Sequence, residues 1–222
     1  MAASTRPPAD RPIVWVNCAV SLDGRLAFAR GARARLSGPE DLDRVHRMRA
    51  ESDAILIGVG TVAADDPSLR VDWARAGRPP GRPPLRVVLD ARGRLPAGAR
   101  ILDRSAPTLV ATSASGRDRL PPGVETVVAG EESIDLDRLL AALRERGVER
   151  LMVEGGARVL ASVLRSRRFD RLTVYYAPVV IGGSLAPPMV AGRDTAGPEE
   201  LTALKLEGVA RLGAGFVATF VP

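Results

Sequence analysis

The stretch Leu151-Met152-Val153-Glu154-Gly155-Gly156-Ala157-Arg158 decides the fold, because an apolar run ends at a carboxylate and two glycines and a helix-patterned segment follows at once. This order predicts a strand, a tight turn and a helix. In an α/β protein such a unit places backbone N–H groups and a helix N-terminus at the carboxyl edge of a sheet, where a phosphate group binds well. The glycine pair is equally compatible with a plain tight connection.

The composition is that of an ordinary globular chain. With 222 residues, 45% of them hydrophobic and 26% charged, the chain can bury a sizeable core, and we expect a single domain over residues 13–222. Residues 1–12 are small, polar and rich in proline, so we expect a disordered tail. No apolar run approaches the roughly 20 residues that span a bilayer. The only cysteine, Cys18, fits a reducing compartment, and we therefore expect a cytoplasmic protein.

The formal net charge of +6 raises the question of nucleic-acid binding. Lys205 is the only lysine, and the arginines are spread along the whole chain. Aromatic residues make up 4% of the sequence and do not alternate with a basic cluster, so a base-stacking surface is not expected. A small anionic ligand, bound by a few arginines, remains compatible with this charge.

The first strand carries an unexpected polar side chain. Residues 13–20 are rich in β-branched residues and end in the turn Ser21-Leu22-Asp23-Gly24-Arg25. Asn17 interrupts the apolar run. Because a buried amide without a partner is destabilising, Asn17 either finds a partner inside the core or faces a ligand at the sheet edge.

A second strand, residues 53–58, again ends in glycine, and Gly60-Thr61 begins a short helix. Gly58-Val59-Gly60 resembles the start of a dinucleotide fingerprint, although this motif alone is weak. Thr61 and Asp65 are four residues apart, which places them on one face of that helix. We interpret Asp65-Asp66-Pro67 as the end of the helix and not as a metal-binding pair.

Between these strands, Ser37-Gly38-Pro39-Glu40 predicts a capping box and a helix that runs to about Glu51. Arg49 shares the inner face of that helix with Leu42, seven residues earlier, so it is either paired with an acid or held for an anion. His46, the only histidine, is expected to be structural. No Ser-His-Asp arrangement and no His/Cys metal cluster are expected.

The remaining pattern completes an α/β fold with a mainly parallel central sheet, flanking helices and an antiparallel C-terminal hairpin. Residues 73–84 are expected to form a loop. Ser113 to Arg117 allow two interpretations, a site for the ribose 2′-phosphate of NADPH or a plain serine-rich cap. Further strands are expected at 85–90, 108–112, 124–128, 172–177, 204–210 and 216–221, and a helix at 135–146.

Five segments, taken together and in this order, resemble the pyrimidine reductase family of riboflavin biosynthesis. The resemblance covers about residues 13 to 220 and includes both the reductase half of the bifunctional bacterial deaminase–reductase and the stand-alone archaeal and fungal reductases. Each segment alone is weakly specific. They are residues 16–25, 49–58, 60–69, 151–156 and 177–183.

This resemblance implies a dihydrofolate-reductase-like fold, a homodimer, NADPH as cofactor and no metal. The implied substrate is a pyrimidine ribosylamine 5′-phosphate whose ribosyl group is reduced to ribityl, in either its amino or its deaminated form. The implied catalytic residues are Asp65 and Glu154. The implied cofactor-binding residues are Thr61, Asp65, Val128, Glu154, Gly155, Gly156, Ala157 and Arg158, and the implied substrate-binding residues are Asn17, Ser21, Asp23, Arg49 and Leu69.

The chain departs from the family pattern at two positions. The bifunctional enzymes usually carry lysine at the position of Asn17, whereas the stand-alone type carries asparagine there, as this chain does. Asn17 cannot act as a general acid at neutral pH. The family often carries an arginine at the position of Asp72. Arg70 is the candidate to take over the role of that arginine. The zinc-deaminase motif is absent from the sequence. The candidates for the proton donor are Asp65, Asp23 and a bound water. Two alternative functions are a dihydrofolate or pterin reductase and a non-catalytic nucleotide-binding module.

Overall fold

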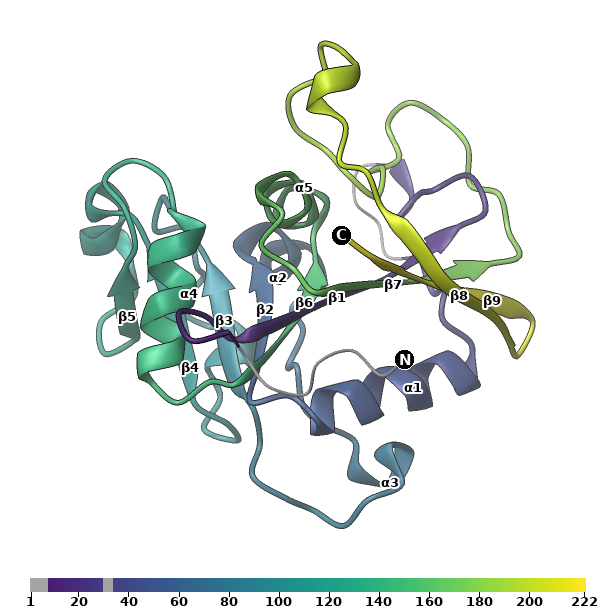
Figure 1. Ribbon diagram of the computed structural model, residues 1–222. Coiled ribbons are helices and arrows are strands. Elements are labelled where there is room, and N and C mark those ends of the chain that lie inside the picture. The colour runs from purple at the N-terminus through teal and green to yellow at the C-terminus, as the bar shows by residue number, and fades with distance from the viewer. Residues whose placement is uncertain (1–7, 30–33) are drawn as a thin grey trace.

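A computed structural model describes residues 8–29 and 34–222 of the chain. Within them, one nine-stranded sheet has the order β5-β4-β3-β2-β6-β1-β7-β9-β8 (Figure 1). The strands β1 to β7 are parallel to one another, and β9 runs antiparallel to both β7 and β8. The strands are β1 (Ile13–Ser21), β2 (Ala54–Gly58), β3 (Leu85–Leu89), β4 (Thr108–Thr112), β5 (Glu125–Val128), β6 (Arg150–Gly155), β7 (Arg171–Ala177), β8 (Lys205–Leu212) and β9 (Gly215–Val221).

Helices cover both faces of this sheet, as parallel βαβ connections require. The α-helices are α1 (Pro39–Ala50), α2 (Val59–Asp65), α3 (Trp73–Ala76), α4 (Leu136–Glu145) and α5 (Ala157–Ser166), and the 3₁₀ turns are η2 (Arg100–Leu102), η3 (Ala114–Arg119) and η4 (Pro198–Glu200). Figure 1 shows α1 and α3 on one side of the sheet and α5 on the other. No helix in the described part of the chain is long and apolar enough to cross a membrane.

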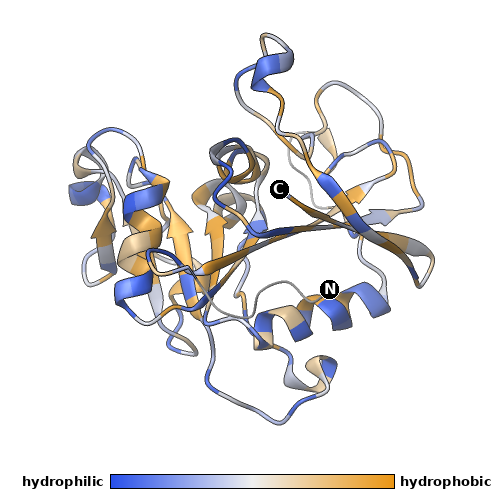
Figure 2. Cartoon of the chain, in the orientation of Figure 1, coloured by the Kyte–Doolittle hydropathy of each residue, from blue (hydrophilic) through white to orange (hydrophobic). Residues whose placement is uncertain are grey.

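The core consists of an apolar layer on each face of the sheet. Alternate residues of β1, such as Val14 and Val16, pack with α4 and α5, whereas Ile55 and Ile57 of β2 pack toward α1. The central strands are therefore apolar on both faces, which explains their nearly continuous hydrophobic runs (Figure 2). The paired glycines that end β6 lie between these layers, at the carboxyl edge of the sheet.

Two expectations about helices were wrong. The helix α1 has Gly38 at its N-cap and no capping side chain, because the Ser37 hydroxyl donates to the buried carboxylate of Asp41 at 2.5 Å instead. Residues 73–84 are not entirely loop. Asp72 caps the single turn of α3 by accepting the N–H of Arg75, and one turn is too short to show helical periodicity in the sequence.

The two ends of the described chain are both held against the sheet. The terminal hairpin is confirmed, with β8 and β9 joined across Gly213 in the left-handed conformation (φ +58°). Residues 1–7 of the expected tail lie outside the described residues. Arg11, within the expected tail, donates two hydrogen bonds to Asp170, at 2.6 and 2.8 Å, and is thereby held next to the start of β7.

Candidate active site

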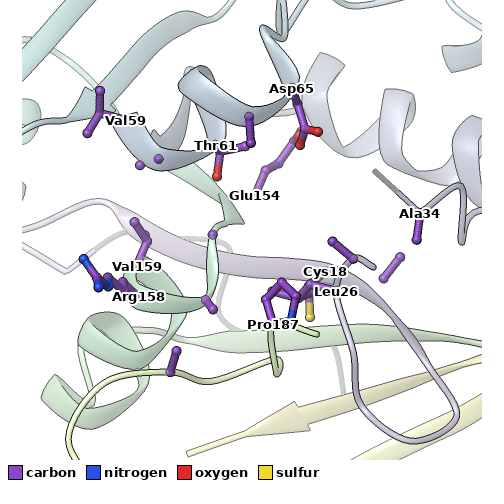
Figure 3. Close-up of a pocket in the computed structure, with 18 of the residues that line it drawn as sticks. Cys18, Leu26, Ala34, Val59, Thr61, Asp65, Glu154, Arg158, Val159 and Pro187 are labelled. Atoms are coloured by element: carbon purple, nitrogen blue, oxygen red, sulfur yellow. The ribbon is translucent and has the colours of Figure 1, made fainter. Parts of the chain in front are cut away.

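A cavity of about 670 Å³ opens where β1, β2, β3 and β6 end (Figure 3). Thr61 and Asp65 project from α2 on the side where Glu154 lies, and Arg158 lies farther along, beside Val159 (Figure 3). The carboxyl edge of a parallel sheet is where ligands bind in open α/β folds. Six of the residues predicted for the site line this cavity, namely Thr61, Asp65, Glu154, Gly156, Ala157 and Arg158.

The floor of the cavity is formed by two strand-to-helix turns in close contact. Gly155 and Gly156 have φ of +99° and +89°, which side chains rarely adopt. A Cβ atom on Gly156 would lie 2.8 Å from the hydroxyl oxygen of Thr61, and one on Gly58 would lie 2.8 Å from Val159. The turns after β2 and β6 therefore approach each other only because these positions are glycine. Gly156 also precedes α5, so the N–H groups of its first turn lie at the cavity.

A mostly buried ion pair joins α1 to the end of β6. Arg49 donates to both carboxylate oxygens of Glu154, from Nε at 2.5 Å and from Nη2 at 2.6 Å. The third nitrogen of Arg49 donates to the carbonyl of Arg70 at 2.9 Å. Burial alone lowers the pKa of Arg49, but the charge and hydrogen bonds of Glu154 outweigh it and hold the pKa above its usual value. Of the two roles left open for Arg49, the structure shows pairing with an acid.

The histidine beside this pair has a structural environment. His46 Nδ1 accepts the N–H of Asp72 at 3.0 Å, which links α1 to the cap of α3. Burial, and then the positive charge of Arg49, lower the pKa of His46 below its ordinary value. The imidazole is therefore neutral at pH 7 and serves as an acceptor, in agreement with the structural role expected for it.

Asn17 lies on β1, the strand next to the one that carries Glu154. Val16 is in register with Val153, so the next residues along the two strands are Asn17 and Glu154. The side chain is buried, and its carbonyl oxygen has no hydrogen-bond partner among the described residues. An unpaired buried acceptor is unusual in a folded protein. This oxygen therefore has no observed partner among the described residues of the core, which leaves a ligand at the sheet edge as the other interpretation of Asn17.

Ser21 and Asp23 lock the turn after β1 and do not line the cavity. The Ser21 hydroxyl donates to Asp23 at 2.7 Å, and the N–H groups of Ile181 and Gly182 donate to the same carboxylate at 3.0 and 2.8 Å. These bonds, with that from Ile181 first, lower the pKa of Asp23 to about 2. Asp23 is therefore ionised at neutral pH and is unsuited to donate a proton.

This locked turn predicts a pH effect. Since the folded-state pKa of Asp23 lies below its ordinary value of 3.8, its contribution to stability is present above that value and is lost as the pH falls toward about 2. We expect Asp23→Asn to flatten the fall in unfolding free energy over this interval, measured by urea denaturation at a series of pH values. Asp43→Asn, which alters an exposed carboxylate paired with Arg75, is the control. Identical pH profiles for Asp23→Asn and the unaltered protein would contradict this account.

Five other predicted residues lie outside the cavity lining, and two of them, Asn17 and Arg49, are described above. Val128 ends the edge strand β5 and is 40% exposed, with β4 and β3 between it and the end of β2. Leu69 is buried in the core with φ +48°, and Gly155 is buried against Leu160. Arg70, the candidate substitute for the missing arginine, pairs instead with Asp103 at 2.5 Å, and only its carbonyl reaches the site.

Another part of the cavity lining could not be predicted from local sequence patterns. Leu26, Pro187 and Ala191 line the side nearest β1 because loops distant in sequence pair through their backbones. Leu26 donates its N–H to Pro187 at 2.9 Å, and Ala191 to Ala157 at 3.2 Å. Cys18 lines the same side, where burial raises the pKa of its thiol to about 12 and keeps it protonated.

Two further expectations concern ligands. Ser113 is the cap of η3, since its hydroxyl oxygen accepts the N–H of Gly116 at 3.2 Å and donates to the carbonyl of Ala91 at 2.5 Å. The serine-rich segment is thus a cap and does not line the cavity. Within residues 8–29 and 34–222, no group of three or more His, Cys, Asp or Glu side chains is placed to hold a metal ion.

Known proteins share both the sequence and the fold of this chain. The 2,5-diamino-6-ribosylamino-4(3H)-pyrimidinone 5′-phosphate reductase of Archaeoglobus fulgidus is 42% identical over 220 residues, which cover 94% of this chain and 97% of that protein. The crystal structure of Acinetobacter baumannii RibD superposes with a TM-score of 0.79 at 30% identity, over 96% of this chain and 59% of that one.

The fold is also that of dihydrofolate reductase. The enzyme from Enterococcus faecalis matches 94% of this chain and 95% of its own with a TM-score of 0.50 at 10% identity, which is a likeness of fold alone. The expected dihydrofolate-reductase-like architecture is therefore confirmed. The model of the RibD C-terminal domain matches residues 12–218, nearly the whole chain. This chain belongs to the RibD C-terminal domain family.

Proposed function

We propose that this protein is an NADPH-dependent reductase of riboflavin biosynthesis, which reduces the ribosyl group of a pyrimidine ribosylamine 5′-phosphate to ribityl. The observation that carries the proposal is the juxtaposition, in one cavity, of a side-chain-free glycine turn and the carboxylate of Glu154, which Arg49 holds in place from outside the lining. The first suits a dinucleotide, and the second offers a fixed acceptor to a polar substrate. The relative from Archaeoglobus fulgidus, whose name states this pyrimidine reduction, supports the same reading.

The residues around the cavity fit a nicotinamide dinucleotide. A side chain at Gly156 would fill the space beside Thr61, whereas glycine leaves the backbone N–H groups of the α5 turn accessible to a pyrophosphate. Gly155 supplies the second left-handed position of this turn, and Ala157 and Arg158 begin the helix. Thr61 and Asp65 provide a hydroxyl and a carboxylate opposite this turn. Val128, which lies away from the cavity, is the least supported of the predicted cofactor contacts.

When bound, NADPH supplies the hydride that reduces C1′ of the opened sugar. The protein orients the two reactants and excludes water, which is how a reductase lowers the barrier without covalent chemistry of its own. Glu154, held in place by Arg49, presents a fixed carboxylate at the boundary between cofactor and substrate. The unpaired carbonyl oxygen of Asn17 offers a further acceptor on the neighbouring strand β1. Ser21 and Asp23 hold the turn after β1 against Ile181 and Gly182, and Leu69 lies in the core, so these three are the least supported of the predicted substrate contacts.

The proton needed to complete the reduction comes from Asp65 or from a bound water in this proposal. Asp23 does not qualify, because its pKa lies at about 2 and its carboxylate is engaged by two backbone N–H groups. Asn17 has no proton to donate at neutral pH. Asp65 lines the cavity at the end of α2, on the same side as Glu154 (Figure 3).

Turnover with defined acceptors tests this function. The purified protein is mixed with NADPH and either the amino or the deaminated ribosylaminopyrimidine 5′-phosphate, with dihydrofolate as a control, and the loss of NADPH absorbance is recorded. We expect oxidation with one of the pyrimidines and none with dihydrofolate. Turnover with dihydrofolate alone would assign the protein to the pterin reductases. Binding of NADPH without reduction of any acceptor would point to a non-catalytic module.

We also propose a cytoplasmic homodimer that pairs through the edge strand β8. Leu206 and Val209 of this strand are 55% and 59% exposed, and its outer backbone edge has no partner strand among the described residues. Exposed apolar side chains on an unpaired edge favour association with another strand. The surface is thus suited to a second copy of the chain.

Substitution on β8 tests this assembly. We expect Val209→Asp to convert a dimer into a monomer, because a charge would replace an apolar side chain at the interface. Light scattering coupled to size-exclusion chromatography measures the mass. Glu207→Gln, on the same strand but paired with Arg171, should leave the dimer intact. A monomeric unaltered protein would contradict the proposed assembly.

A further inference from the structure

The strand β3 carries a buried arginine that does not line the cavity. Arg86 has no exposed surface, although its neighbours on the strand are apolar. Its guanidinium donates to the carboxylate of Asp103 and the hydroxyl of Thr108, both at 2.9 Å, and to the backbone carbonyls of Ser68, Asp103 and Ala106. A buried guanidinium is tolerated only where its donors and its charge are satisfied. Arg86 therefore binds together the segment that follows α2 and the segment that precedes β4.

The first of these segments has strained backbone. In the 66–70 segment, which follows α2, Asp66 and Leu69 have φ of +41° and +48°. Residues with side chains rarely adopt this left-handed conformation, and it persists only where the surrounding structure imposes it. Such strain is concentrated at functional sites. It points to a role for the path of this segment, and therefore for the contacts that hold it.

Side chains at both ends of the 66–70 segment contact the segment that contains Asp103. The carboxylate of Asp66 accepts the N–H of Arg100 at 2.8 Å. At the other end, Arg70 donates to one carboxylate oxygen of Asp103 at 2.5 Å, and Arg86 donates to the other oxygen. Asp103 thus lies between an exposed guanidinium and a buried one, and it joins the 66–70 segment to the core.

The backbone of Arg70 connects this segment to the ion pair at the cavity. Its carbonyl accepts a hydrogen bond from one nitrogen of Arg49 at 2.9 Å, while the other two nitrogens donate to the carboxylate of Glu154. A guanidinium is planar and rigid, so both partners together set its orientation. A shift of the Arg70 carbonyl would turn Arg49 and displace the Glu154 carboxylate, which lines the cavity.

We propose that Asp103, supported by Arg86, is a positioning residue for the reduction. It fixes the backbone of Arg70, and the carbonyl of Arg70 in turn orients Arg49. The carboxylate of Glu154 takes its place from this chain of contacts. The inference rests on the proposed function, since it assigns Glu154 a task in turnover. Asp103 does not line the cavity and lies between η2 and β4, so its effect reaches the substrate only through these residues.

Steady-state kinetics measure the effect on turnover. We expect Asp103→Asn to lower kcat by about 10- to 100-fold, since a displacement of about 1 Å in a group at the reaction costs this much. The KM for NADPH should stay within about twofold, because other contacts form the glycine turn proposed for the dinucleotide. Asp43→Asn is the matched control. It removes an exposed carboxylate that pairs α1 with Arg75, and kcat should not change.

The orientation of Arg49 is observable in the protein without substrate or cofactor. The Nε–Hε resonance of Arg49 in an NMR spectrum reports its hydrogen bond to Glu154, and Arg49→Lys identifies this resonance by its absence. We expect the resonance to shift or broaden in Asp103→Asn and to stay in place in Asp43→Asn. A defect in the fold that did not involve the ion pair would not produce this difference.

A second variant covers the case in which Asp103→Asn does not unfold cooperatively. Arg70→Met removes an exposed side chain and leaves the pair between Arg86 and Asp103 in place, so the protein keeps its fold. It also releases the end of the 66–70 segment from Asp103. The resonance of Arg49 should therefore shift or broaden in Arg70→Met as well. Because no substrate is present, a direct contact of Arg70 with substrate does not contribute.

A double variant separates positioning from a general loss of stability. Arg49→Lys keeps a positive charge for Glu154 but lacks the rigid fork that also reaches the Arg70 carbonyl. If Asp103 acts through Arg49, adding Asp103→Asn to Arg49→Lys should lower kcat by less than about twofold further. An independent structural role would multiply the two losses. Where Arg49→Lys is inactive, the NMR comparison decides alone.

The possible results separate this inference from the function on which it rests. An unchanged Arg49 resonance in both Asp103→Asn and Arg70→Met, an equal fall of kcat in Asp43→Asn, or the full further loss in the Arg49→Lys background would overturn the role of Asp103. If the unaltered protein nevertheless reduces the pyrimidine with NADPH, the proposed function survives those results. An unaltered protein that reduces neither pyrimidine would overturn the proposed function, and with it the positioning role, even where the Arg49 resonance responds.

Discussion

Gly156→Asp should weaken NADPH binding by about 100-fold or more, the largest effect on the cofactor expected from a single substitution. Gly156 has φ +89°, which strains any side chain by about 1–3 kcal/mol. Its Cβ would lie 2.8 Å from the hydroxyl oxygen of Thr61, in the space proposed for the pyrophosphate. The new carboxylate would also occupy the anion-binding position at the α5 N-terminus and repel the negatively charged pyrophosphate. Each 1.4 kcal/mol corresponds to about tenfold in affinity.

Fluorescence titration of NADPH into the folded variant measures this loss. Gly147→Asp is the matched control, because Gly147 has a similar φ of +80° at the end of α4 but meets nothing within 4 Å and does not line the cavity. It should carry comparable backbone strain and bind NADPH normally. A Gly156→Asp protein that melts cooperatively and keeps the NADPH affinity of the unaltered protein would place the pyrophosphate elsewhere.

Glu154→Gln should impair both stability and activity. The substitution leaves the guanidinium of Arg49 mostly buried beside an uncharged partner, and breaking a buried pair in this way destabilises a protein by about 3 kcal/mol. It also removes the fixed carboxylate from the substrate boundary, for which we expect kcat/KM to fall by about 10- to 100-fold. Urea denaturation measures the first effect and steady-state kinetics the second.

A double variant separates these two effects. Arg49→Met combined with Glu154→Leu replaces the ion pair by apolar side chains, which often restores stability. We expect a stable protein without pyrimidine reduction. Asp137→Asn, which removes one side of the exposed pair between Arg168 and Asp137, should change stability by less than about 1 kcal/mol. Full activity in the double variant would show that the ion pair serves the fold and not the reaction.

Local sequence patterns predicted the glycine turns and their strands because each depends on neighbouring residues. The Glu154-Gly155-Gly156 turn needs left-handed backbone at both glycines, and the sequence provides it. Helical periodicity correctly predicted that Arg49 lies on the inner face of α1, although Leu42, which was expected to share that face, is 37% exposed. The partner of Arg49, Glu154, lies 105 residues away and was not predicted. Single-residue details were less predictable. The Ser37 hydroxyl bonds to Asp41 because that carboxylate is buried nearby, and no local pattern reports this burial.

The rest of the site depends on strand order and on contacts between distant loops. Placing β6 between β1 and β2 brings Glu154 beside Asn17, although their strands are far apart in sequence. The loop containing Pro187 reaches the cavity only through its backbone pairing with Leu26. Arg94 likewise belongs to no motif and lines the cavity because Asp90 and Gly93 shape its turn. Tertiary arrangement, and not local preference, determines these contributions.

Isotope transfer tests the central claim most directly. The protein is incubated with the ribosylaminopyrimidine 5′-phosphate and, separately, with each of the two stereoisomers of NADPH deuterated at nicotinamide C4, and the product is analysed by mass spectrometry and NMR. We expect one of the isomers to place a single deuterium on C1′ of a ribityl product. Oxidation of NADPH without deuterium on C1′, or recovery of the ribosyl compound unchanged, would contradict the account.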